Sequence, residues 1–187
     1  MISELNIAMF NYINHFAGTN PILDYAAIIA AKYMPIIFIL WVVYLWFKNK
    51  YQNTALYCFY ASILGLSFNF IIGSFYYHPR PFMLHLGKLL VLHSSDSSFP
   101  SDHTTFMLSI AFTLIYFRKT RTSGLILFVL GFLGGFARVF VGIHFPFDII
   151  GSAVVAIFSS FIIYSLRTRL KPLNNLFISL YSSLIRR

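Results

Sequence analysis

Three short segments contain the residues of this chain whose types and spacing best suit phosphate chemistry. They are HPRPF with Arg80, FPSDH with Ser101, Asp102 and His103, and RVFVGIHFPFD with Arg138, His144 and Asp148. Guanidinium groups stay charged at any accessible pH and present planar forks of N–H donors that match phosphate oxygens. Arg80 and Arg138, which share these segments with histidines and aspartates, would hold a phosphoryl group and stabilise the charge of its transition state.

The third segment has the spacing expected of a histidine nucleophile. Because Pro146 lies between His144 and Asp148, we expect His144 in a loop and Asp148 in the first turn of a helix. A carboxylate there can accept a hydrogen bond from one ring nitrogen of His144, which leaves the other nitrogen free to attack. We also expect Asp148 to cap its helix.

The second segment has the pattern of a helix start. We expect Ser101 to cap this helix with its side chain, while the N–H groups of Asp102 and His103 face an anion. His103 can then protonate a leaving oxygen. The Asp102 carboxylate would repel phosphate, so its side chain is expected to turn away and form a hydrogen bond elsewhere.

The composition indicates that a membrane must position these segments. Of the 187 residues, 58% are hydrophobic and 10% are charged, against roughly 45–50% and about 25% in soluble domains. A cytosolic enzyme, a disordered chain and a secreted disulfide scaffold are therefore excluded, and the lone Cys58 has no partner for a disulfide. The net charge is +9, but the basic residues cluster between apolar runs, which is typical of membrane topology rather than nucleic-acid binding.

Apolar runs of about 20 residues, the length that crosses a bilayer, predict an all-α membrane bundle in one domain, residues 1–187. The five predicted spans are 22–47, 55–77, 101–118, 123–141 and 147–166. Amphipathic patterns at both termini predict interfacial helices. Their apolar residues are Ile2, Leu5, Met9, Tyr12 and Phe16 before the first span, and Leu173, Leu176, Phe177, Leu180 and Leu184 in a stretch that Pro172 opens.

The distribution of basic residues predicts the orientation in the membrane. Loops 48–54 and 118–122 and the C-terminal tail hold ten lysines and arginines, whereas the opposite side holds three: Arg80, Lys88 and Arg138. Basic loops stay cytoplasmic, so the N-terminus is expected outside and the C-terminus inside. The three reactive segments then meet at the outer face.

Taken together, the segments resemble the three-part signature of the type 2 phosphatidic acid phosphatase family, which vanadium haloperoxidases share. The matching residues are Arg80-Pro81, then Pro100-Ser101-Asp102-His103, then Arg138 with His144 six residues later and Asp148 four beyond. The Asp in the second motif, in a small five-span chain, is most similar to bacterial bacitracin-resistance undecaprenyl-diphosphate phosphatases. The similarity covers about residues 55–166.

This resemblance implies roles for particular residues. His144 would be the phosphoryl-accepting nucleophile with Asp148 as its partner, and His103 would be the general acid. The phosphate ligands would be Arg80, Ser101, the backbone at Asp102, and Arg138. The resemblance implies no metal ion and no cofactor.

The same resemblance implies an activity and a place for it. The chain would hydrolyse undecaprenyl diphosphate to undecaprenyl phosphate through a phosphohistidine, at the outer face of the bacterial cytoplasmic membrane. This reaction recycles the lipid carrier of cell-wall (peptidoglycan) precursors. The expected partners are an isoprenoid lipid diphosphate and membrane lipids, and no nucleic acid.

Two positions depart from the family pattern. Gly73 stands where the first motif usually has a lysine, and we expect Lys88 or His78 to supply the missing charge. Ala137 stands where the third motif usually has a serine, so a hydroxyl contact is lost.

Several alternatives remain open at this point. The substrate could instead be phosphatidylglycerophosphate, phosphatidate or a lipid A phosphate, and from another class the chain could be a small transporter or accessory membrane subunit. His78, His85 and His93 share a loop with four serines. Their irregular spacing favours a solvated loop over a metal site.

Overall fold

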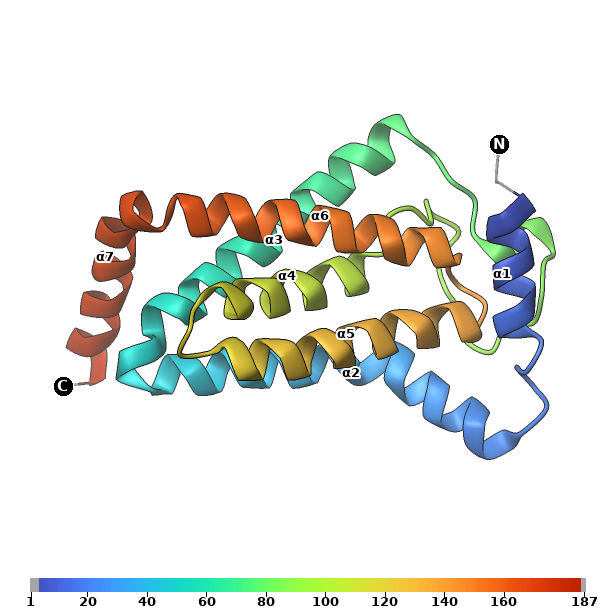
Figure 1. The fold of residues 1–187 in the computed structure, drawn as a ribbon, viewed down its shortest axis with the longest axis horizontal. Coiled ribbons are helices and arrows are strands. Elements are labelled where there is room, and N and C mark those ends of the chain that lie inside the picture. Colours follow the sequence, from blue (N-terminus) through green and yellow to red (C-terminus); the bar gives the residue numbers. More distant parts are fainter. Residues whose placement is uncertain (1–3, 186–187) are drawn as a thin grey trace.

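The computed structural model describes residues 4–185, which form helices and, within that range, no strand (Figure 1). The α-helices are α1 (Glu4–Asn14), α2 (Pro21–Phe47), α3 (Gln52–Phe75), α4 (Asp102–Tyr116), α5 (Arg121–Phe140), α6 (Pro146–Ser165) and α7 (Arg167–Ile185). Two short 3-10 helices, η1 (Asn49–Tyr51) and η2 (Pro81–Leu84), lie between them. The prediction of an all-α fold is confirmed.

Four of these helices, α2, α3, α5 and α6, are long and apolar enough to cross a membrane. The predicted span 101–118 corresponds to α4, which has only 15 residues and is therefore about 22 Å long. Figure 1 shows α4 in the middle of the bundle, and nine of its residues are buried. Because α4 packs mainly against other helices, it needs neither the length nor the apolar surface of the helices around it.

Close contact between α4 and its neighbours depends on small residues. A Cβ atom on Gly65 of α3 would lie 2.8 Å from the Ser109 Oγ atom of α4, so only glycine fits there. The Ser109 hydroxyl in turn lies 3.1 Å from the Ser159 hydroxyl of α6. Small residues and hydroxyl pairs are the usual means by which helices associate inside a membrane.

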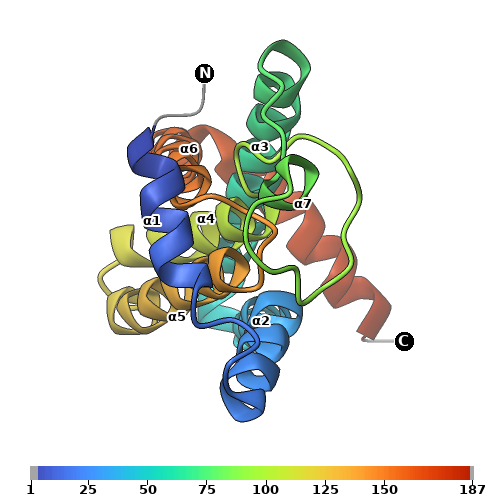
Figure 2. The same cartoon turned by 90° about the vertical axis from the view of Figure 1, so that its right-hand side faces the viewer.

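The two ends of the bundle differ in character. One end, crossed by α7, carries the short connections after α2 and α4 and the start of α7, where the basic clusters found in the sequence lie (Figure 1). The other end, crossed by α1, carries the long α3–α4 connection and the α5–α6 connection (Figure 2). The three reactive segments therefore share the α1 end, as the sequence predicted.

The C-terminal helix begins earlier than the sequence suggested. The prediction that Pro172 opens this stretch was wrong, because α7 begins at Arg167 and contains Pro172. A helix that begins right after the turn at Leu166 needs no proline to start it. The five predicted apolar side chains of α7 are exposed, as an interfacial helix requires.

The N-terminal helix α1 shows the predicted apolar surface but buries a different face. Leu5, Met9 and Tyr12 are exposed, as is Phe16 just beyond the helix, and Ile2 lies outside the described residues. The buried face contains Asn6, Phe10 and Asn14. A helix with one apolar face toward lipid and one asparagine face toward protein can be fixed by hydrogen bonds.

Asn14 ties together two segments that carry the reactive residues. Its amide nitrogen donates to the carbonyls of Lys88 (2.9 Å) and Phe140 (2.7 Å), and its Oδ1 atom accepts from the Lys88 N–H (2.6 Å). A Cβ atom at Gly87 would lie 2.2 Å from this Oδ1 atom, so glycine permits the approach. The α3–α4 connection is thereby fixed to the end of α5.

Replacing Asn14 with alanine should therefore destabilise the protein. The change removes three hydrogen bonds and leaves buried backbone groups unpaired, which corresponds to about 2–4 kcal/mol in the free energy of unfolding. Thermal unfolding in detergent micelles should show a clearly lower midpoint. Asn11→Ala, on the exposed face of α1, is the control. Equal midpoints for the two variants would show that the hydrogen bonds of Asn14 do not stabilise the protein.

Candidate active site

His144 lies in the short connection between α5 and α6. Gly142 adopts a φ angle of +89°, and a Cβ atom there would lie 2.3 Å from the Lys88 carbonyl oxygen. Glycine therefore lets the chain turn against the α3–α4 connection before α6 begins at Pro146. The His144 side chain ends up 1% exposed, in the loop that the sequence predicted.

The Nε2 atom of His144 faces both arginines. Arg80 Nη1 lies 3.1 Å from it and Arg138 Nη2 lies 3.4 Å from it. Guanidinium nitrogens can only donate, so Nε2 presents a lone pair to them. The ring nitrogen that would attack phosphorus therefore lies between the two groups best suited to hold a phosphate.

The Nδ1 atom of His144 faces a carboxylate, as predicted. It lies 3.3 Å from Asp148 Oδ2, which also accepts hydrogen bonds from the Phe145 N–H (2.8 Å) and from the Ser98 hydroxyl. The bond from Phe145 confirms that Asp148 caps α6. This arrangement places the proton on Nδ1 and leaves Nε2 free.

Burial and positive charge keep the His144 ring neutral. Burial lowers its pKa most strongly, and Arg138 and Arg80 lower it further, against the opposing effect of Asp148, to about 3. At neutral pH the neutral ring, with its one proton on Nδ1, is therefore the stable form, which is the form a nucleophile requires.

Arg80 is held in place by the protein backbone and one acid. Its Nε and Nη2 atoms lie 2.8 Å and 2.7 Å from Asp96 Oδ1, and Nη2 also donates to the Ser97 carbonyl. Nη1 donates to the Ile143 carbonyl (2.9 Å). These contacts leave Nη1 directed at His144. The Asp96 pKa is lowered because bonds from Ser94 and Arg80 outweigh the effect of burial.

Arg138 is positioned by a proline in another helix. In a regular helix the carbonyl of Ala31 would accept from the N–H of residue 35, but that residue is Pro35, which has no N–H. Arg138 Nη1 donates to this free carbonyl at 2.9 Å. The Arg138 Nε atom is buried without a hydrogen-bond partner among the described residues, so this donor of the guanidinium is unused.

Replacing Pro35 with alanine should weaken this positioning. The new N–H would compete with Arg138 for the Ala31 carbonyl, and we expect a turnover number about 3- to 10-fold lower. Turnover of the purified variant measures the effect. Pro172→Ala in α7 removes the other proline inside a described helix, at the opposite end of the bundle, and an equal loss in both variants would argue against a specific role for Pro35.

The start of α4 supplies the second motif, with one difference from the prediction. Ser101 is the residue before the helix, but its side chain makes no capping bond; its Oγ atom instead accepts from the Thr104 hydroxyl. The prediction of a Ser101 side-chain cap was wrong, because the Ser101 hydroxyl accepts from the Thr104 hydroxyl and not from a backbone N–H of the first turn. The first N–H groups of α4 therefore have no side-chain cap.

Asp102 and His103 occupy the first turn of α4. The Asp102 carboxylate turns toward α3 and accepts from the Asn69 amide at 2.8 Å, as expected for a structural role. His103 is half-buried, and Arg138, His93 and Arg80 all act electrostatically on its ring. His103 is thus within electrostatic range of the two arginines that flank His144.

Lys88 and His78, which were considered as substitutes for a lysine at position 73, contact other parts of the chain. The Lys88 side chain is exposed and passes beside Gly18. His78 is buried, and its Nδ1 atom lies 3.3 Å from Asp148 Oδ1, so it adjoins the carboxylate rather than the guanidinium groups.

Ser98, His93 and Asp96 belong to the site but were not among its predicted residues. The interpretation of their segment as a solvated loop was wrong for Ser98, which is fully buried, and for His93, which is half-buried, whereas Asp96 is exposed. The single signal in the sequence was their proximity to FPSDH. The described residues contain no group of three histidine, cysteine, aspartate or glutamate side chains that could hold a metal ion.

Ser98 should contribute to catalysis through its contacts with the Asp148 and His144 side chains. Its hydroxyl donates to Asp148 and lies 3.3 Å from His144 Nδ1. Ser98→Ala removes both contacts, and we expect an about 10-fold lower turnover number with little change in KM. Ser95→Ala, an exposed serine in the same loop, should have normal kinetics. Normal turnover in Ser98→Ala would contradict this role.

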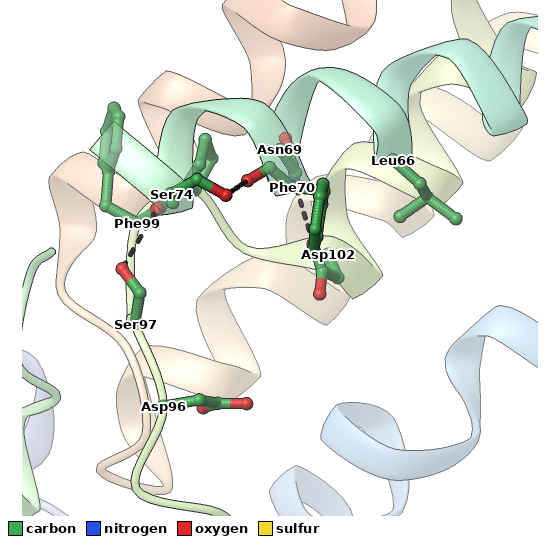
Figure 3. Close-up of a pocket in the computed structure, with 10 residues that line it drawn as sticks. Leu66, Asn69, Phe70, Ser74, Asp96, Ser97, Phe99 and Asp102 are labelled. Atoms are coloured by element: carbon green, nitrogen blue, oxygen red, sulfur yellow. Dashed lines mark hydrogen bonds between the residues drawn. The ribbon is translucent and has the colours of Figure 1, made fainter. Parts of the chain in front are cut away.

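A cavity of about 440 Å³ adjoins the site (Figure 3). It lies between the C-terminal half of α3 and the segment that leads into α4. Asp96 projects from that segment and Asp102 from the first turn of α4, while Asn69 and Ser74 come from α3. Gly73 also lines the cavity, and no lysine or arginine does.

Comparisons with known proteins agree with this geometry. The model of the PAP2 superfamily matches residues 53–172. The chain is 33% identical to undecaprenyl-diphosphatase BcrC of Bacillus subtilis, covering 97% of this chain and 94% of the relative. It is 30% identical to the bacitracin transport permease protein BcrC of Bacillus licheniformis, covering 99% and 91%.

Two further matches extend the comparison. The putative undecaprenyl-diphosphatase YbjG of Escherichia coli is 30% identical, covering 81% of this chain and 77% of the relative. Among solved structures, the crystal structure of Aquifex aeolicus LpxE superposes with a TM-score of 0.74 at 28% identity, covering 88% of this chain and 97% of that one.

Proposed function

Since the chain belongs to the PAP2 superfamily, we propose that it is a membrane phosphatase that converts undecaprenyl diphosphate to undecaprenyl phosphate and inorganic phosphate. One observation carries the proposal: His144 Nε2 lies between Arg80 and Arg138, while Nδ1 faces Asp148. The names of two relatives, from Bacillus subtilis and Escherichia coli, support the choice of substrate.

In the proposed reaction, the two arginines bind oxygens of the terminal phosphate. The lone pair of His144 Nε2 attacks phosphorus, and the bond from phosphorus to the bridging oxygen breaks. His103 donates a proton to that oxygen, and undecaprenyl phosphate leaves. Water then attacks the phosphorus of the phosphohistidine while His103 takes a proton from that water. The bond from phosphorus to His144 Nε2 breaks, and inorganic phosphate is released.

The membrane-facing surface beside His103 supports a lipid substrate. A cavity of about 310 Å³ is lined by Pro35, Ile39, Leu66, Asp102, His103 and Phe106. A second cavity of about 300 Å³ shares Ile39 and Phe106 with the first and is almost entirely apolar. Together they lead from the proposed general acid along α2 and α4, where an isoprenoid chain can stay in the bilayer while its head group reaches the arginines.

The proposed location is the outer face of the bacterial cytoplasmic membrane. The basic clusters and the site lie at opposite ends of the bundle (Figure 1), and basic loops stay on the cytoplasmic side. The site would therefore face outward and return the lipid carrier used in cell-wall synthesis. This role would also suit resistance to bacitracin, an antibiotic that appears in the name of the Bacillus licheniformis relative.

That relative is named a transport permease, so transport is the rival function. A transport path needs charged residues in the depth of the membrane. Among the described residues, the buried arginines and acids are Arg80, Arg138 and Asp148, all at the site end, and Lys32 is exposed. This distribution favours an enzyme.

Phosphate release from a panel of lipid phosphates tests the proposal. The purified protein in detergent should release phosphate from undecaprenyl diphosphate faster than from phosphatidate, phosphatidylglycerophosphate or a lipid A phosphate. A chelator should leave the rate unchanged. No release from any of these lipids would contradict the proposed phosphatase, and a preference for another lipid would contradict the proposed substrate.

A further inference from the structure

The proposed substrate carries more negative charge than the permanent cations of the site compensate. A terminal phosphate alone carries about −1.5 to −2 charges at neutral pH, and the second phosphate adds more. Arg80 and Arg138 are the two arginines beside His144, and Arg80 is already paired with Asp96. A further cationic group within reach of the phosphates would complete the charge balance.

His93 lies where such a group is needed. Its Nε2 atom lies 3.3 Å from Arg138 Nη2, and its ring centroid lies 6.4 Å from that of His144. The His93 side chain is 21% exposed, against 1% for His144. His93 thus approaches the same guanidinium from the open side, where a head group would enter.

His93 is prepared to change from an acceptor to a donor. Arg138 can only donate, so the His93 Nε2 atom carries a lone pair, and Nδ1 lies 3.3 Å from the Ser94 carbonyl, to which it can donate. Burial, Arg80 and Arg138 lower the His93 pKa, against opposing effects of the Ser94 carbonyl and Asp96. A phosphate bound to the arginines would reverse this field and favour a second proton on the ring.

The neighbouring charged groups are consistent with this change. Asp96 Oδ1 lies 3.9 Å from His93 Nδ1 on the loop, and Arg138 approaches from α5. His103 on α4 interacts electrostatically with His93, and His144 faces it from the α5–α6 connection. Asp96 is therefore the one described acid at hydrogen-bonding or ion-pair distance from His93, and it would stabilise the protonated ring.

We propose that His93 is a further substrate-binding residue, whose protonated ring donates from Nε2 to a phosphate oxygen of the lipid diphosphate. This inference rests on the proposed function. It also assigns the third positive charge of the site to His93 rather than to Lys88, which lies beside Gly18, or to His78, which adjoins Asp148.

The test compares His93→Ala, His93→Gln and His93→Lys in the purified full chain. Two quantities are measured: the affinity for inorganic phosphate, by calorimetric titration, and kcat and KM for undecaprenyl diphosphate. We expect His93→Ala and His93→Gln to weaken phosphate affinity and raise KM by about 10-fold or more, whereas His93→Lys restores most of the loss. His85→Asn is the control, because it removes a histidine from the same loop and asparagine tolerates the positive φ angle there.

The outcomes separate the two proposals. Two results would show that the role of His93 is wrong while the proposed function stands, provided that the wild-type protein turns over the lipid. One is that His93→Gln binds phosphate as tightly as wild type. The other is that His93→Lys binds phosphate no more tightly than His93→Gln. If the wild-type protein binds phosphate in a His93-dependent way but releases none from lipids, the proposed function is wrong and phosphate binding by His93 stands. The Gln and Lys variants decide the matter even if the alanine variant fails to fold.

Discussion

Replacement of His144 by alanine is expected to abolish phosphate release, with a loss of at least about 10⁴-fold in turnover. The change removes the Nε2 lone pair that lies between Arg80 and Arg138. Those arginines remain, so the variant should still bind phosphate. His144 is buried and neutral at neutral pH. Its replacement therefore removes the nucleophile without changing the net charge of the site.

The measurement is phosphate release under single-turnover conditions, together with phosphate affinity. His15→Ala, which removes an exposed histidine just after α1, should retain normal rates. A His144→Ala protein with turnover within a few-fold of wild type would show that another group attacks phosphorus. Retained phosphate affinity would show that the variant is folded.

Replacement of Asp148 by asparagine should lower the turnover number by about 10³- to 10⁴-fold. The carboxylate accepts hydrogen bonds from Phe145 and Ser98 and faces His144 Nδ1. An amide has one acceptor oxygen, and if its NH₂ group faces His144 it favours the tautomer with the proton on Nε2. That tautomer has no lone pair directed at phosphorus.

Asp148→Asn is nearly isosteric, so it separates chemistry from packing. The expected result is a lower kcat with little change in KM, measured on the lipid diphosphate. Asp24→Asn, which alters an exposed pair of contacts with the Gly18 N–H in the α1–α2 connection, is the matched control. A normal kcat in Asp148→Asn would mean that Asp148 only caps α6.

The sequence was sufficient to predict the fold class and that several residues of the candidate site lie together. Apolar runs identified the helices to within a few residues, and the position of Pro146 correctly separated the loop residue His144 from the helical residue Asp148. Motifs defined by spacing along the chain predict neighbours well when each motif lies at the end of a helix. Arg80, Arg138 and His144 are brought together for this reason.

The parts that could not be predicted depend on contacts between distant segments. Nothing local in the sequence links Pro35 to Arg138, because the freed Ala31 carbonyl gains its partner only when α2 packs against α5. Similarly, His93 and Ser98 looked like members of a polar loop. Their burial follows from the way Asn14 and Gly142 hold the α3–α4 connection against α5, which is a tertiary effect.

The central claim is that His144 Nε2 becomes covalently attached to phosphorus, and rapid quenching tests it most directly. Protein mixed with undecaprenyl diphosphate labelled in its terminal phosphate is quenched in alkali, which preserves phosphohistidine, and then digested and sequenced by mass spectrometry. The account predicts label on His144 during turnover and none in His144→Ala. Label on any other residue, or steady turnover with no labelled protein at the earliest times, would contradict it.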